Sequence, residues 1–262
     1  MKGRMEKKCR WLLVPSLLGI LVFYCVPFFR VLLYSMWENQ FSQKWVWFDN
    51  YIKILKNQYF RLALKNSFLM IVIGVPILVA GALLLAIAFN RGGKRLKCLK
   101  LCVILPMLLP AAGVILVFRS MFAGTETALP VCSLYIWKNC GMIFILFGAA
   151  VALLPQETFE AARLDGAAGL RMHLRVTIPL LMPTILFVTL LGIVYSFRVF
   201  KESYLYYGSN YPPDNGYSLQ YYMNNHFAKL NYQNLAAGAV ITTIIICIIV
   251  IVGLKLQKKF EV

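Results

Sequence analysis

Acidic residues are scarce in this chain. Its 262 residues include 10 Asp and Glu against 27 Lys and Arg, and 14% of the residues are charged whereas 60% are hydrophobic. A soluble domain carries about 25% charged residues, so this composition excludes an ordinary globular protein. It also excludes a disordered chain, because such chains are poor in apolar residues. The class that remains is a protein whose apolar surface faces lipid.

Histidine is scarce as well, and the cysteines form no recognisable framework. The chain has 2 His and 7 Cys, the cysteines stand singly in or beside apolar runs, and no CxxC occurs. We therefore expect neither a metal site nor a set of disulfides. A phosphate loop is also missing, because residues 92–95 (GGKR) lack the first glycine and the spacing of G-x-x-x-x-G-K-[ST]. We expect this chain to bind no cofactor, ATP included. With its few acids on a polar loop rather than in a pocket, we also expect it to be no enzyme.

Long apolar runs are what the sequence has instead. About 20 apolar residues in a helix cross the core of a bilayer. Six such runs occur, at about 11–35, 67–89, 99–121, 134–154, 180–200 and 235–256. None of them contains Asp or Glu, and the third contains Pro106 and Pro110. The first is too long for a cleaved signal peptide and lacks a small-residue cleavage site. The sequence predicts an all-α integral membrane protein with six transmembrane helices in a single domain, residues 1–262.

The distribution of Lys and Arg indicates which loops face the cytoplasm. Residues 1–10 carry five, residues 90–98 carry four, and the 155–179 loop and the last eight residues carry three each. The opposite loops are longer in total and hold eight. By the positive-inside rule, both termini and the 155–179 loop are predicted to be cytoplasmic, in a membrane that the chain crosses several times.

Arg30 and Arg198 lie inside apolar runs, near the outer ends in this topology. A charge within the membrane marks a functional site by default. The alternative is that both side chains extend to the outer lipid headgroups, and the sequence leaves both interpretations open.

Residues 155–179 form the most polar stretch in the second half of the chain, yet Ala and Gly are frequent in it. Pro155 suits the first position of a helix, and residues 156–164 are predicted to be helical. Gly166 is predicted to end that helix, because glycine adopts the left-handed cap. A second short helix is predicted at 168–174. The pattern indicates a helix–turn–helix whose small residues let another protein surface approach closely.

This stretch also carries a motif. Residues 154–183 contain EAA at 160–162, followed by Gly166, and resemble the EAA loop of the inner-membrane permease subunits of ABC importers. The match is closest to the carbohydrate-uptake branch with the maltose, lactose and glycerol-phosphate permeases. Residues 47–67, after the first span, and 137–141 (WKNCG) resemble further segments of these permeases. The resemblance covers nearly the whole chain and implies the type I ABC importer permease fold.

In that family the loop docks into a groove of the ATP-hydrolysing subunit. The resemblance implies that Glu160 accepts charge-assisted bonds from this partner, that the alanines keep the contact close, that Gly166 makes the turn, and that Leu170 and His173 enter the groove. The implied coupling residues are Glu160, Ala161, Ala162, Asp165, Gly166, Ala167, Leu170 and His173. Two alternatives remain: Glu160 pairs with Arg163 on a solvated helix, or His173 only fills space where the family usually has an aromatic residue.

The spans that flank the loop are implied to line the path of the solute. The positions that match sugar-contacting residues of maltose-type relatives are Tyr135, Asn139, Met142, Tyr195, Ser196 and Val199. Tyrosine rings and an amide suit a sugar. The alternative is helix–helix contact, in which such residues also serve.

The resemblance implies partners as well. These are two copies of an ATPase subunit holding ATP and Mg, a second and related permease subunit, and an extracytoplasmic solute-binding protein. No nucleic acid is expected, because no soluble basic module is left. Residues 123–130 form a shorter external segment than relatives carry, interpreted as the remnant of a deletion.

Two other classes of protein remain open. One is an ATP-independent carrier or channel, which the missing intramembrane acids disfavour, and the other is a membrane scaffold that anchors a soluble partner.

Overall fold

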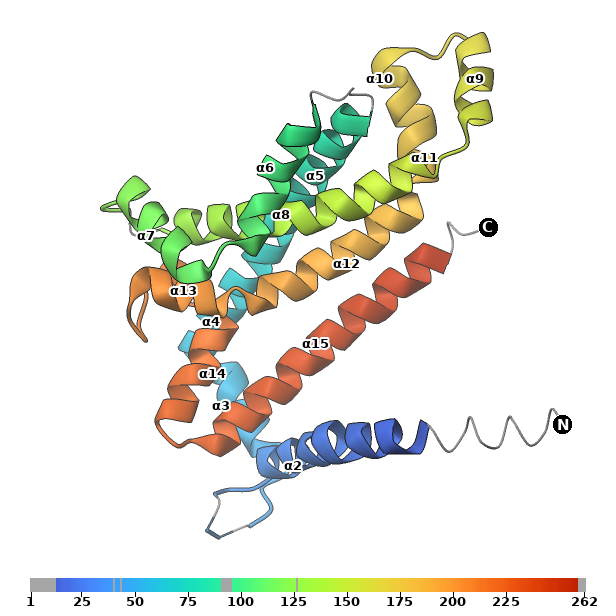
Figure 1. Ribbon diagram of the computed structural model, residues 1–262. Helices are drawn as coiled ribbons and strands as arrows, with labels where there is room; N and C mark the ends of the chain where they lie inside the picture. The colour runs from blue at the N-terminus through green and yellow to red at the C-terminus, as the bar shows by residue number, and fades with distance from the viewer. Residues whose placement is uncertain (1–12, 40, 43, 91–95, 126, 259–262) are drawn as a thin grey trace, which may run out of the picture. The chain divides into compact units, whose positions relative to one another are not determined.

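The computed structural model describes residues 13–39, 41–42, 44–90, 96–125 and 127–258 (Figure 1). Within these ranges the regular secondary structure is helical, apart from an isolated β-bridge between Trp37 and Trp45. Several basic residues on which the predicted orientation depends lie outside the described residues, namely those of 1–10 and Arg91, Lys94, Arg95 and Lys259.

Five of the helices described are long and apolar enough to cross a membrane. They are Leu13–Ser35, Gln58–Asn90, Leu129–Ala152, Met182–Tyr207 and Tyr232–Lys258. Each overlaps one of the predicted runs, which confirms the all-α membrane fold. Four of them extend beyond their runs at the end that the predicted topology places outside, where polar residues such as Lys65 can end an apolar run without ending the helix.

The run at 99–121 departs from a straight span. Leu99–Leu108 and Ala111–Met121 are separate helical pieces that meet at 106°, and they make a sixth span only if the bent pair counts as one. They belong to α6 (Leu96–Leu108) and α7 (Ala111–Met121). The cause is Pro110, whose backbone is extended (φ −64°, ψ 135°), because a proline has no N–H to donate and disfavours a helical conformation in the residue before it. The predicted span at 99–121 is thus a bent pair of helices rather than one straight helix.

Three widened turns precede prolines in otherwise continuous helices. The π-helical segments are η1 (Leu21–Cys25), η2 (Met70–Gly74) and η3 (His173–Thr177). Each ends two residues before a proline: Pro27, Pro76 and Pro179. A proline ring clashes with the carbonyl four residues earlier, and a π turn moves that carbonyl away. The helices therefore pass through these prolines instead of ending.

The described residues form two compact units, one within 1–61 and 222–245 and the other within 62–221 and 246–262. In the first unit, α2 (Val26–Ser35) leads to α3 (Asp49–Lys56). The buried Asn50 amide donates to the carbonyls of Ser35 (3.0 Å) and Trp37 (2.8 Å) and so holds the connecting segment. The Phe60 ring meets Tyr222 with centroids 5.1 Å apart.

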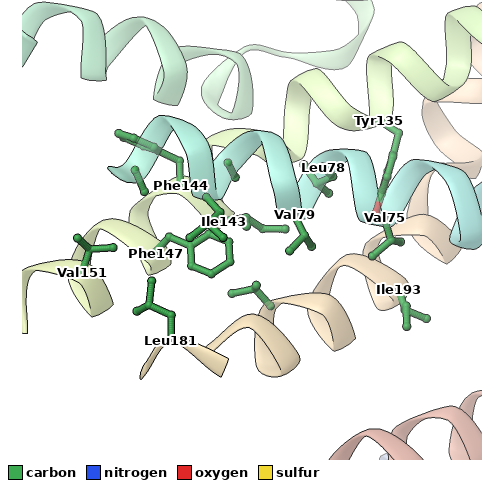
Figure 2. Packing of buried hydrophobic residues seen from close by; sticks show 14 residues of the cluster. Val75, Leu78, Val79, Tyr135, Ile143, Phe144, Phe147, Val151, Leu181 and Ile193 are labelled. Carbon is green, nitrogen blue, oxygen red and sulfur yellow. The ribbon is translucent and has the colours of Figure 1, made fainter. Parts of the chain in front are cut away.

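The second unit is built around α5 (Val75–Asn90), α8 (Leu129–Ala152) and α12 (Met182–Arg198). A cluster of buried side chains fills the space between them (Figure 2). The labelled members are Val75, Leu78, Val79, Tyr135, Ile143, Phe144, Phe147, Val151, Leu181 and Ile193. Beside this core, α6 packs so closely on α8 that a Cβ added at Gly141 would lie 2.9 Å from the Val103 carbonyl oxygen.

The segment after α13 (Phe200–Tyr207) folds back on α4 (Gln58–Leu69) through polar contacts. The Asn66 amide donates to the carbonyls of Asp214 (2.6 Å) and Tyr217 (2.9 Å). The Ser67 hydroxyl accepts from the Leu219 N–H at 3.1 Å, at the start of α14 (Leu219–Ala228). This end of the unit is therefore fixed by hydrogen bonds as well as by apolar packing.

Candidate functional site

Residues 155–180 form a helical hairpin, which we call the α9 hairpin. Pro155 has an extended backbone (φ −63°, ψ 126°) and directly precedes α9 (Gln156–Leu164), whose bounds confirm the predicted first helix. Figure 1 shows that α8 runs from the end of the unit with α7 and α13 to the end with the hairpin. The hairpin therefore extends a long membrane helix rather than standing apart from it.

The turn of the hairpin confirms the predicted helix stop at Gly166, whose φ is +79°. The Gly166 N–H donates to the Arg163 carbonyl at 3.0 Å, and the Ala167 N–H donates to the Ala162 carbonyl at 2.9 Å. These two bonds are those of a Schellman motif, which satisfies the last carbonyls of a helix. A residue with a Cβ would be strained here, so the glycine fixes the direction in which the chain leaves α9.

The second helix of the hairpin is longer than the sequence predicts. It begins as α10 (Gly169–Met172) and continues through η3 and α11 (Ile178–Leu180) to the start of α12. The predicted end at 174, ahead of Pro179, was wrong, because the π turn accommodates the proline. At the junction, the Leu181 N–H bonds to the Thr177 carbonyl and the Ile185 N–H to the Leu181 carbonyl, at 3.0 and 2.8 Å. The hairpin is thus joined to α12 by helical hydrogen bonds.

Most of the predicted coupling residues lie on the surface of the hairpin. Those exposed are Glu160, Ala161, Asp165, Gly166 and Leu170, and those half-buried are Ala162, Ala167 and His173. Two of them line a hollow of about 520 Å³ between the hairpin and the ends of α5 and α8, namely Glu160 and His173. The His173 Nδ1 lies 3.1 Å from the Thr177 hydroxyl. Leu170 is in contrast 73% exposed.

Glu160 makes no ion pair with Arg163 or with any other residue in the part of the chain that the structure describes. Both side chains line the same hollow, but the i,i+3 pair that was the alternative to docking is not formed among the described residues. The Glu160 carboxylate is therefore available to a cation supplied from outside the chain.

Sequence reasoning missed two exposed leucines at this end of the unit. Leu164 is 90% exposed at the last position of α9, and Leu153 is 83% exposed just before Pro155. Leu153 lies within the predicted run 134–154, whereas Leu164 lies on the polar loop, where contact with another protein would remove its apolar surface from water. The available signal was a leucine directly before a helix-ending Asp-Gly on an otherwise polar helix.

The predicted solute-path residues lie at the other end of α8. Four of them, Tyr135, Asn139, Tyr195 and Val199, line one cavity of about 320 Å³, which we call the α8–α12 cavity. Ser196 instead lines a neighbouring cavity of about 380 Å³. Met142 lines neither of these two cavities, although it is 37% exposed.

Tyr135 and Asn139 also take part in helix packing. The Tyr135 ring is 1% exposed and reaches past Val75 of α5 (Figure 2). Its hydroxyl donates to the Gly192 carbonyl on α12 at 2.7 Å. The Asn139 amide donates to the Tyr135 carbonyl at 2.8 Å. For Tyr135 these contacts favour the helix-packing alternative, whereas Asn139 keeps its side-chain oxygen available.

The charged part of the α8–α12 cavity comprises Lys138, Arg198, Lys201 and Glu202. The Lys138 Nζ lies 3.1 Å from Glu202 Oε1, and these side chains are 17% and 20% exposed. Arg198 was singled out by the sequence, whereas Lys201 and Glu202 lie just beyond the predicted end of the span at 200. They were missed because the helix continues to Tyr207.

These features define a multi-pass membrane protein in which a helical hairpin is joined to two long apolar helices, and these line a cavity at their other end. The chain belongs to the family of binding-protein-dependent transport system inner membrane components, whose model matches residues 79–261. It is therefore an inner-membrane transport permease, as the resemblance of its loop implied.

Similar proteins agree with this assignment. The arabinooligosaccharides transport system permease protein AraP of Bacillus subtilis is 27% identical, with 94% of this chain and 87% of that protein covered. The multiple sugar-binding transport system permease protein MsmF of Streptococcus mutans is 26% identical, with 96% of this chain and 95% of that protein covered. A chain of a bacterial ABC transporter involved in the import of the acidic polysaccharide alginate has a TM-score of 0.75 at 20% identity, covering 99% of each chain. That structural likeness shows a shared fold.

Proposed function

We propose that this chain is the permease subunit of an ATP-driven importer, that it forms half of the path for a sugar or oligosaccharide, and that it couples to ATPase subunits through the α9 hairpin. The names of the similar permeases support a carbohydrate solute. The observation that carries the coupling role is the continuity of the hairpin with α12, together with its exposed leucines and a Glu160 that has no ion partner among the described residues.

The hairpin carries groups suited to docking on another protein. Leu164 and Leu170 are exposed apolar side chains on either side of the turn, and burying each against a partner contributes about 1.5–3 kcal/mol. The Glu160 carboxylate accepts charge-assisted hydrogen bonds from a basic residue of the ATPase. Ala161 and Ala167 leave room for close approach, and Gly166 sets the angle between the two helices.

Movement of the hairpin is transmitted to the solute cavity through two helices. Leu153 and Leu154 are the only residues between α8 and Pro155, and the second helix of the hairpin continues into α12. Both α8 and α12 line the α8–α12 cavity. ATP-driven closure of the ATPases draws the hairpins of two permease subunits together and rotates these helices, so that the cavity opens to one side and then to the other.

The remaining parts of the complex follow from this mechanism. Two ATPase copies hold ATP and Mg, a second and related permease subunit supplies the other half of the path, and an extracytoplasmic binding protein delivers the solute. Both termini and the hairpin face the cytoplasm, so the α8–α12 cavity lies toward the outer side. This chain itself binds neither nucleotide nor metal.

Two other functions make different predictions. An ion-coupled carrier uses acidic groups inside the membrane, but Glu202, at the outer end of its span, is already paired with Lys138. A scaffold that only anchors a soluble partner needs no link between its docking hairpin and an intramembrane cavity.

Co-purification from the native membrane in mild detergent, followed by mass spectrometry, tests the proposal. We expect an ATPase subunit and a second permease subunit, with ATP hydrolysis that rises when solute-loaded binding protein is added. Crosslinking through a thiol introduced by Ala161→Cys captures weak partners. If the chain is recovered without any nucleotide-binding partner, the result would favour a carrier. If an ATPase is recovered but its rate of hydrolysis does not change when the loaded binding protein is added, the result would favour a scaffold.

A further inference from the structure

The α8–α12 cavity carries more positive charge than its own acid balances. Its lining includes three cations, Lys138, Arg198 and Lys201, and one carboxylate, Glu202. The Lys138–Glu202 pair, at 3.1 Å, is about four-fifths buried, and a pair so removed from solvent is screened much less than an exposed one. Glu202 is therefore already neutralised and does not balance the other two cations.

Arg198 and Lys201 have no counter-charge within the described part of the chain. They stand three residues apart near the end of the Met182–Tyr207 helix, a spacing that places like charges on one face, where they repel. Neither makes an ion pair or a side-chain hydrogen bond with another residue in the described ranges. Two repelling cations beside a neutralised acid are the arrangement that an anion from outside the chain stabilises.

The rest of the lining is suited to a sugar. Tyr195 offers an aromatic ring, and the Asn139 side-chain oxygen is available, since its amide nitrogen donates to the Tyr135 carbonyl. Asn139 and Lys138 are half-buried within α8. Arg198 and Lys201 are themselves exposed, and they line the same cavity as these half-buried polar groups. The two cations thus stand where the cavity meets its surroundings, with polar walls behind them.

We propose that the imported solute is anionic, and that Arg198 and Lys201 bind the carboxylate or phosphate of an acidic sugar in the α8–α12 cavity. This inference rests on the proposed function and specifies its substrate class. The Arg198 guanidinium can hold two oxygens of such a group at once, and Lys201 adds a second charge. The Lys138–Glu202 pair joins α8 to α13 and fixes the wall beside them.

The charge of the cavity can be measured without knowing the solute. Met107 lines the same cavity, so Met107→Cys places a thiol there in the purified complex, in phosphatidylcholine nanodiscs. The rate at which each reagent modifies this thiol is divided by its rate with a free thiol in solution. On this scale the anionic methanethiosulfonate ethylsulfonate is expected to react faster than the cationic methanethiosulfonate ethyltrimethylammonium. Removing both charges with Arg198→Gln and Lys201→Gln should lower that preference about tenfold. The parent chain without Met107→Cys corrects for native cysteines, and Lys53→Gln with Lys56→Gln removes two charges elsewhere and should change nothing.

Protection of the same thiol tests the ligand. Trigalacturonate is expected to slow the modification more than the neutral trisaccharide maltotriose, and the advantage is expected to vanish in the Arg198→Gln, Lys201→Gln variant. Equal protection by both sugars, protection by neither, or no preference for the anionic reagent would overturn the inference. The measurement is repeated in discs that also contain phosphatidylglycerol. If this anionic lipid abolishes the preference for the anionic reagent, the two cations are assigned to a lipid phosphate and the inference is overturned.

The outcome is separable from that of the proposed function. The same preparation is assayed for its ATPase subunit before the thiol is modified. If the ATPase is present and the acidic sugar has no advantage, the importer stands and the anionic solute fails. If no ATPase is present, the coupling proposal fails whatever the charge of the cavity.

Discussion

Glu160 is the charged residue of the hairpin that is proposed to bind the ATPase. It is exposed on α9, beside a hollow of about 520 Å³, and has no ion partner in the described structure. A carboxylate that meets a basic partner side chain makes bonds about twice as strong as those between neutral groups. Inverting its charge leaves the membrane helices untouched and replaces this attraction with repulsion.

Glu160→Lys is therefore expected to reduce solute uptake at least about tenfold while the amount of chain in the membrane stays unchanged. Glu157→Lys is the matched control, since Glu157 is exposed one turn earlier on α9 and should retain most of the uptake. Uptake and membrane content are measured in the same cells. Normal transport by Glu160→Lys, or equal losses from both variants, would show that the position has no specific docking role.

His226 gives a prediction for the other unit. It lies on α14, half-buried against Tyr222 with ring centroids 4.4 Å apart. Burial, and then the nearby Lys229 cation, lower the pKa of the His226 imidazole. The unfolded chain therefore binds this proton more readily than the folded one, and the folded state loses stability as the pH falls below about 6.5.

The melting temperature of the purified protein is accordingly expected to fall from about pH 7.5 to about pH 5.5. His226→Gln cannot take up the proton and should show a smaller fall over the same interval. Differential scanning fluorimetry at both pH values gives the comparison. An equal fall in the two proteins would mean that other groups account for the pH dependence.

At the scale of helices, close approach depends on particular glycines. Gly141 of α8 faces the α6 backbone, and an added Cβ would lie 2.9 Å from the Val103 carbonyl oxygen and 3.0 Å from Ile104 Cα. These are backbone atoms, which cannot rotate away as a side chain can. Gly148, two turns further along the same helix, has nothing within 4 Å of its added Cβ.

Gly141→Ala is expected to destabilise the protein by about 1–3 kcal/mol, because α6 and α8 must move apart. Gly148→Ala adds the same methyl group to open space and should be neutral or slightly stabilising. Thermal unfolding in detergent measures both. If the two substitutions lower the melting temperature equally, the contact between α6 and α8 is looser than the structure has it.

Element boundaries show what the sequence could and could not predict. The apolar runs located every span, and the Asp165-Gly166 pair located the end of α9, because both signals are local. The bend at Pro110 and the passage of a helix through Pro179 depend on whether neighbouring turns can widen, and hydropathy carries no information about that. The helix ends at 58 and 207 were missed because polar residues end an apolar run without ending a helix.

At the scale of the whole molecule, the sequence could predict where the candidate site lies but not the contacts that its residues make. The motif at 160–162 located the α9 hairpin, and four of the six solute-path residues share one cavity. The burial of Tyr135, the exposure of Leu164 and the charge balance around Arg198 follow from how helices pack in three dimensions. A linear pattern does not specify those contacts.

The central claim is that the α9 hairpin contacts an ATPase, and site-specific photocrosslinking in the native membrane tests it most directly. A photoreactive amino acid replaces Leu164 or Leu170 on the hairpin, and Leu116, 68% exposed on α7, serves as the control. The account predicts that both hairpin positions form adducts with a nucleotide-binding subunit, identified by mass spectrometry, and that Leu116 does not. Adducts with the ATPase from Leu116 alone, or none from the hairpin, would contradict it.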